Sequence, residues 1–197
     1  MRNILKFGLA LVASFTVFTA SANDAKLSVR VKEGAGKVVS FTVVESNNVH
    51  VAIYSNDGGV IFDENIKGNG TEINRSYDLT AFPQGTYFIE TETGAKVSRH
   101  QITIADKYAT VSEAVTEVLK PVVVAKNGVV TVNILNAEKT PVAIKMYDEN
   151  NNELYAETVT GQQALAKKFD VKNTAGKNIT LVMTYNNKTF VETIAAR

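Results

Sequence analysis

The chain has 197 residues, no cysteine, and 21 Lys and Arg against 20 Asp and Glu. Because the two signs are balanced and interspersed, clustered basic surfaces for nucleic acid or anionic membranes are excluded. Without cysteine there are no disulfides and no lipid-modified cysteine, so stability must come from strand pairing and apolar burial.

The first residues read as an export signal. Arg2 and Lys6 flank the start of an apolar run over residues 7–19, and Ala20-Ser21-Ala22 follows. This order is typical of a secretory signal peptide, 1–22, cleaved after Ala22. The run is shorter than the roughly 20 residues that span a bilayer. We therefore expect an exported protein of the periplasm or the extracellular cell surface, without a stable membrane anchor.

Residues 23–105 consist of short alternating segments that end at Gly, Asn or Asp. Alternation of apolar and polar residues predicts half-buried strands, and the turn residues predict hairpins. Seven strands at this spacing predict an antiparallel sandwich of immunoglobulin-like or fibronectin type III-like layout. We expect these strands near residues 26–32, 37–45, 49–53, 60–62, 71–79, 87–91 and 96–104.

A hairpin pattern occurs twice in the chain. HVAIYSNDGGVIFDE at residues 50–64 is matched by AIKMYDENNNELYAE at residues 143–157, an offset of 93. The offset aligns Tyr54 with Tyr147, Ile61 with Leu154, Phe62 with Tyr155 and Glu64 with Glu157. Residues 120–197 therefore predict a second sandwich of about seven strands, and the fold class is all-β with two tandem immunoglobulin-like sandwiches.

Residues 106–119 carry no strong strand signal and lie where the two copies join. Val111, Val115 and Val118 have helical spacing, with Thr110 and Glu113 placed as a capping box. Branched valines disfavour a helix, so we expect a linker and leave helix and extended chain as alternatives.

The first domain resembles a known family. The hairpin at residues 51–62, then Leu79 and Phe82-Pro83-Gln84-Gly85-Thr86-Tyr87-Phe88-Ile89, resemble the small sandwich domains at the C-termini of Bacteroidota proteins exported by the type IX secretion system. More broadly they resemble the immunoglobulin-like and fibronectin type III modules of that phylum. The resemblance covers about 40 residues of the first domain and reaches the second only through the repeat.

That resemblance implies a tyrosine corner, in which the Tyr87 hydroxyl bonds to backbone upstream of it, near Pro83. The sequence also departs from the family. A Pro-Asn-Pro opening is absent, and the corner motif lies in the internal domain, whereas the second domain has residues 175–179 at that place. An ordinary tandem sandwich protein is therefore the more economical interpretation.

Catalytic motifs are absent from the sequence. His50 and His100 are the two histidines, and neither has a neighbouring nucleophile motif or second metal ligand. We expect both at solvated strand positions, and we predict no enzymatic activity and no cofactor.

Asp148, Asn150 and Asn152 imitate the first three ligands of a calcium loop. Glu153 stands where the loop needs glycine, and Val159 stands where it needs a bidentate glutamate. A hairpin turn rich in turn-forming residues explains the cluster better, with calcium as the weaker alternative.

The leading function hypothesis is association with a protein or cell-surface partner through sandwich edges or loops. One alternative is weak carbohydrate binding through loop aromatics, although Tyr54, Tyr87 and Tyr147 occupy repeated or corner positions that favour structural roles. Another is type IX secretion cargo whose last domain is a sorting signal. The sequence names neither the partner nor the oligomeric state, and we expect specificity in the differing turns 56–59 and 149–152.

Overall fold

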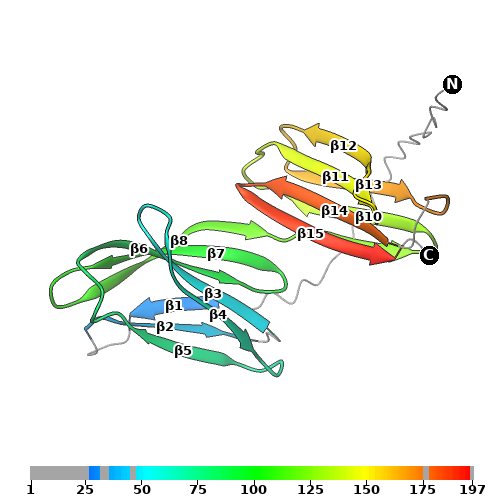
Figure 1. The fold of residues 1–197 in the computed structure, drawn as a ribbon. Helices are drawn as coiled ribbons and strands as arrows, with labels where there is room; N and C mark the ends of the chain where they lie inside the picture. Colours follow the sequence, from blue (N-terminus) through cyan, green and yellow to red (C-terminus); the bar gives the residue numbers. More distant parts are fainter. Residues whose placement is uncertain (1–26, 32–35, 45–47, 175–177, 196–197) are drawn as a thin grey trace.

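The computed structural model describes residues 27–31, 36–44, 48–174 and 178–195, so the predicted signal peptide lies outside the described residues. These residues form 15 strands, which Figure 1 shows as two sandwiches arranged end to end. Within the described ranges, no helix is long and apolar enough to cross a membrane. The two tandem antiparallel sandwiches predicted from the sequence are confirmed.

The first sandwich combines a small sheet of order β1-β2-β5 with a large sheet of order β4-β3-β6-β7-β8. Without β8, this is the strand order of a fibronectin type III domain, in which three strands face four. The strands are β1 (Leu27–Val31), β2 (Val38–Val43), β3 (Asn48–Ser55), β4 (Val60–Lys67), β5 (Ile73–Asp78), β6 (Gly85–Glu92), β7 (Lys96–Ile104) and β8 (Ala109–Leu119).

The second sandwich repeats that order, with a small sheet β13-β10-β9 and a large sheet β12-β11-β14-β15. Each strand of the first sandwich except β8 therefore has a counterpart at the same place in the second. The strands are β9 (Val122–Lys126), β10 (Val129–Leu135), β11 (Val142–Asp148), β12 (Glu153–Val159), β13 (Ala164–Asp170), β14 (Asn178–Tyr185) and β15 (Lys188–Ala195).

The segment expected as a linker, residues 106–119, contains a strand and no helix. β8 pairs antiparallel with β7, from Ile104 opposite Ala109 to Lys96 opposite Leu119. The sequence of β8 does not show the alternation of apolar and polar residues that marks a strand, for two reasons. The register with β7 shifts near His100, and residues 112–117 are all exposed. Strand alternation therefore fails here although the backbone is extended.

Each sandwich has its own apolar core between its two sheets. In the first, alternate residues of the small sheet face those of the large sheet, including Phe41, Ile53 and Ile89 at 0–1% exposure. In the second, Val132, Ile144 and related side chains do the same. Alternate burial along β2 and β10 follows from the two-residue period of a strand.

The repeated hairpin keeps its irregularities as well as its strands. In both copies the register shifts at the tyrosine, between Ile53 and Tyr54 and between Met146 and Tyr147. Both sandwiches also close the gap between β4 and β5, or β12 and β13, with an edge-to-face aromatic pair of centroid distance 5.0 Å. The pairs are Phe62 with Tyr77 and Tyr155 with Phe169.

The connection between the sandwiches is very short. The Lys120 amide donates to the Ala95 carbonyl (2.8 Å), so the β7–β8 ladder continues to Lys120. Pro121 alone then separates Lys120 from β9. Figure 1 shows β8 running from the first sandwich toward the second. Proline has no amide hydrogen and a fixed φ, which suits the point where one ladder stops and the next begins.

Contacts from both sandwiches stabilise this junction. Glu92 pairs with Lys120 and Glu90 with Lys188, each at 2.6 Å. Val97 and Val118 from the first sandwich pack with the core of the second. The junction thus combines ion pairs with apolar burial and covers one end of the outer face of the first large sheet.

Candidate interaction surfaces

The tyrosine corner implied by the family resemblance is present. The Tyr87 hydroxyl donates to the Pro83 carbonyl oxygen at 2.9 Å, and its ring packs edge-on against Phe82 at 5.4 Å. Gly85 has a φ of 154° at the bend. Tyr87 is 8% exposed and belongs to the first core, so it has a structural role.

The two histidines lie in different environments. His50 lies 2.9 Å from an Asp63 carboxylate oxygen on the neighbouring strand and is partly exposed. The expectation of a solvated position is wrong for His100, which is 9% exposed, with Nδ1 3.1 Å from the Ser112 carbonyl oxygen. The irregular pairing with β8 covers it, a strand that the sequence did not reveal.

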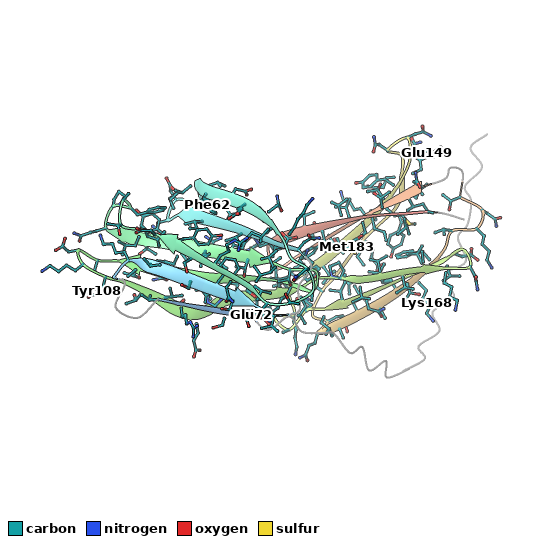
Figure 2. The ribbon with its side chains drawn as sticks, turned by 90° about the horizontal axis from the view of Figure 1, so that it is seen from below. Phe62, Glu72, Tyr108, Glu149, Lys168 and Met183 are labelled. Carbon is teal, nitrogen blue, oxygen red and sulfur yellow. The ribbon has the colours of Figure 1, made fainter. Side chains whose placement is uncertain are left out.

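Asp148, Asn150 and Asn152 come together in the β11–β12 turn, where Figure 2 shows the neighbouring Glu149 on a hairpin that projects from the second sandwich. The Asp148 carboxylate accepts the amides of Asn150 (2.8 Å) and Asn152 (2.9 Å) and the side-chain amide of Asn152 (2.8 Å). These bonds, those of Asn152 first, hold the pKa of Asp148 below its ordinary value. The carboxylate thus closes the turn.

Side chains that could ligate a metal are dispersed in the described ranges. Within them, no three His, Cys, Asp or Glu side chains are grouped as metal ligands. An open hollow beside the β4–β5 loop is lined by polar residues such as Lys67, Glu72 and Arg75, with no histidine among its lining residues. Neither observation points to a reaction.

The repeated tyrosines Tyr54 and Tyr147 are both partly buried. The Arg99 guanidinium lies over the rings of Phe88 (4.2 Å) and Tyr54 (5.4 Å). Burial, followed by the nearby Glu90 charge, raises the pKa of Tyr54. Of the aromatic side chains described, only Tyr108, at the turn before β8, is exposed.

Exposed apolar residues lie on the outer side of the small sheet β9-β10-β13, on either side of the polar residues Thr131 and Asn133 of the middle strand. Val122 (53%), Val124 (51%) and Leu135 (59%) are exposed there, next to the small side chains of Ala164 and Ala166. We call these five residues the valine face. Thr131 of the middle strand pairs with Val124 on one side and with Lys168 on the other, so a cation borders this surface. Figure 2 labels Lys168 on the second sandwich.

Most of the same places in the first sandwich are polar, although Val44 stands at the place of Leu135. Aligning the buried positions of β2 with those of β10 gives an offset of 91, which the strand partners then extend across each small sheet. Val122 then corresponds to Ser28, Val124 to Arg30 and Ala166 to Asn74. The fold therefore does not require apolar residues on this side. The signal available in the sequence was the unbroken run Val122-Val123-Val124, which is apolar on both faces of a strand.

A second apolar surface lies at the β3–β4 turn of the first sandwich. Val60 is 61% exposed and Ile61 is 45% exposed, with Asp57 and Asp63 on either side of them along the chain. We call Val60 and Ile61 the hairpin tip. A hydrogen bond from the Ser55 hydroxyl lowers the pKa of Asp57, which favours its charged form.

The residues at the places of Val60 and Ile61 are different in the second sandwich. Glu153 replaces Val60, and Leu154, which replaces Ile61, packs against the second core. The hairpin tip is thus apolar and unpacked in one copy only. The sequence predicted specificity in the adjacent turns 56–59 and 149–152 and aligned Ile61 with Leu154, without distinguishing the exposed residue from the packed one.

The two sandwiches also differ in charge. Residues 23–119 contain nine Lys and Arg against thirteen Asp and Glu, whereas residues 120–197 contain ten against seven. The acidic half carries the hairpin tip and the basic half carries the valine face. The nearly neutral total conceals this asymmetry.

Residues 35–105 match the family model described as "Secretion system C-terminal sorting domain". The resemblance to type IX sorting domains is therefore confirmed for the first sandwich, and the protein is exported. The matched family is a sorting domain and not an enzyme family. The match does not extend to the last domain, where the cargo alternative placed the signal.

Solved structures give further similarities. They include a biofilm-associated protein BSP domain (17% identity, 86% of this chain, 29% of that chain, TM-score 0.28). A two-domain fibronectin type III segment of chicken tenascin is 11% identical, with 87% of this chain and 98% of that chain covered and a TM-score of 0.29. The receptor tyrosine kinase Torso is also 11% identical, with 87% of this chain and 72% of that chain covered and a TM-score of 0.26. The chain thus spans less than a third of the biofilm-associated protein. No curated protein is significantly similar in sequence.

Proposed function

We propose that this exported tandem sandwich is a non-catalytic association module of the cell envelope. The observation that carries the proposal is the valine face, because Ser28, Arg30 and Asn74 stand at the places of Val122, Val124 and Ala166 in the first sandwich. Large exposed apolar side chains gathered on one sheet face are typical of protein interaction surfaces. The exposed backbone edges of β8 and β9 would add to such a contact.

Binding of the purified, labelled mature protein to the outer surface of its producing cells tests this function. We expect Leu135→Lys, which puts a charge in place of the most exposed large side chain of the valine face, to reduce binding about tenfold or more. Val191→Lys is the matched control, because Val191 is also 59% exposed but lies on β15 of the other sheet. Equal binding by wild type and Leu135→Lys would reject the proposal.

A second candidate function is cargo for a secretion system, supported by the family match at residues 35–105. Because the match covers the internal domain, we propose residues 35–105 as the sorting element in place of the last domain. Deletion of residues 120–197 should then leave export intact, as measured by fractionating cells. Loss of export would return the signal to the last domain. The two fragments, 23–119 and 120–197, also test the predicted domain limits.

A further inference from the structure

The valine face and the hairpin tip are exposed apolar surfaces whose counterparts in the other sandwich are mostly polar or packed. Lys126, Lys168 and Asp170 lie on the same side of the small sheet as the valine face, so the charged groups there are net positive by one. Asp57 and Asp63 flank the hairpin tip along the chain, so its border is negative. The charges of the two halves follow the same division. Two valine faces would bring like charges together, whereas a valine face and a hairpin tip would bring opposite charges together.

The two surfaces cannot meet within one chain. His50 pairs with Glu92, which bonds to Lys120 at the junction, whereas Ser55 lies at the other end of the eight-residue strand β3. At about 3.3 Å per residue, β3 holds the hairpin tip roughly 25 Å from the end that faces the second sandwich. The valine face begins at Val122, directly after Pro121, and so lies beyond the junction.

We propose that the hairpin tip of one copy docks on the valine face of a second copy, giving head-to-tail self-association. This inference rests on the proposed function, because it names the partner of the same surface. Two different surfaces are used, so the contact is heterologous and continues into a ring or an open chain of copies. Two apolar tip residues bury little area, so the contact is weak and concentration-dependent.

Sedimentation velocity of the full mature chain over a wide concentration range tests the proposal. Wild type should show an average mass that rises with concentration and falls with added salt. Ile61→Lys and Leu135→Lys should each weaken association about tenfold or more. Val115→Lys and Val191→Lys, which alter exposed valines on other surfaces (52% and 59%), should associate as wild type does.

Mixing the two defective variants gives the decisive result. Ile61→Lys keeps an intact valine face and Leu135→Lys keeps an intact hairpin tip, so the mixture should form a one-to-one dimer that grows no further. Circular dichroism melting of each variant verifies that it is folded. A wild type that stays monomeric overturns the proposal, as does an Ile61→Lys variant that associates normally. If wild type stays monomeric but Leu135→Lys still loses cell binding, the association function stands with a different partner.

Discussion

The two sandwiches have the same interior and different exteriors. They share strand order, the shifted register at Tyr54 and Tyr147, and an aromatic pair between the sheets. The outer face of the small sheet is mostly polar in the first sandwich and carries more exposed apolar residues in the second. Inward positions are constrained by packing, whereas outward positions are free to diverge. The outer faces are therefore where the two halves differ most in chemistry.

The aromatic pair shows how far the interior itself can vary. In the first sandwich the hydroxyl belongs to Tyr77 and donates to Glu64 (3.2 Å); in the second it belongs to Tyr155 and donates to Glu157. The glutamates are equivalent, but the ring that carries the hydroxyl has moved to the other sheet. Burial raises the pKa of both tyrosines, so each hydroxyl remains a donor.

Truncating a buried core side chain should give the largest difference in stability between the two sandwiches. Phe41 and Val132 occupy equivalent places and are each 1% exposed. Phe41→Ala should lower the free energy of unfolding by about 3–5 kcal/mol, and Val132→Ala by roughly 2 kcal/mol, because the larger ring leaves the larger cavity. Calorimetry measures both. Equal losses would contradict the idea that the two cores are packed by different side chains at this point.

The tyrosine corner distinguishes the copies by a single hydrogen bond. Tyr87→Phe should reduce the free energy of unfolding by about 1 kcal/mol, because the Pro83 carbonyl loses its donor. The second sandwich has Ile179 at this place and lacks the bond. Urea unfolding measures the change, with the exposed Tyr108→Phe as a control that should have no effect. If Tyr87→Phe and Tyr108→Phe lower the free energy of unfolding equally, the hydrogen bond of the tyrosine corner does not stabilise the first sandwich.

Glu64 and Glu157, the glutamates beside the two aromatic pairs, should differ in how much their contribution to stability changes at acidic pH. Hydrogen bonds from Lys167 (2.7 Å) and then from Tyr155 lower the pKa of Glu157. Because the pKa of Glu157 is lower in the folded state than its ordinary value of 4.5, its ion pair stabilises the fold fully above pH 4.5. This stabilisation is lost as the pH falls through the folded-state pKa. Because Glu157 is 38% exposed, Glu157→Gln should cost under about 1 kcal/mol near neutral pH.

The matched variant for that titration is Glu64→Gln. At the place of Lys167 the first sandwich has Arg75, whose guanidinium donates to the Asn74 carbonyl (3.1 Å). Chemical unfolding from neutral to acidic pH should therefore show the smaller change for Glu64→Gln. A Glu157→Gln effect that does not shrink in acid would contradict the ion pair.

Calcium should have the smallest effect. The Asp148 carboxylate already accepts three hydrogen bonds within its turn, so a cation would have to break them. We expect the melting temperature to stay the same after calcium is added and after a chelator removes it. A rise with calcium that the chelator reverses would establish a metal site. Asp148→Ala should lower the melting temperature in either condition.

Much of the fold could be predicted because alternation is strong where one face of a strand is buried. A strand was expected at residues 96–104, the bounds that β7 has in the structure, because the buried Ile102 and Ile104 alternate with more exposed polar residues. β8 could not be predicted, since most of its residues are exposed. The burial of His100 depends on pairing with β8, so that error followed from the first.

The candidate surfaces were only partly foreseen. The prediction that differences would lie in turns 56–59 and 149–152 stopped one residue short of the hairpin tip. The valine face requires knowing which residues point outward. Alternation alone cannot assign a face within a run such as Val122-Val123-Val124. Only the pairing of three strands that are distant in the sequence brings Val124, Leu135 and Ala166 onto one surface.

The short junction has a consequence for digestion by proteases. Proteases cut where a stretch of chain can leave the structure and lie extended in the active site. Between Lys120, whose amide is bonded in one ladder, and Val122, which begins the next, only Pro121 intervenes. Trimming enzymes in the cell envelope should therefore cut exposed turns such as residues 56–59 before they divide the two halves.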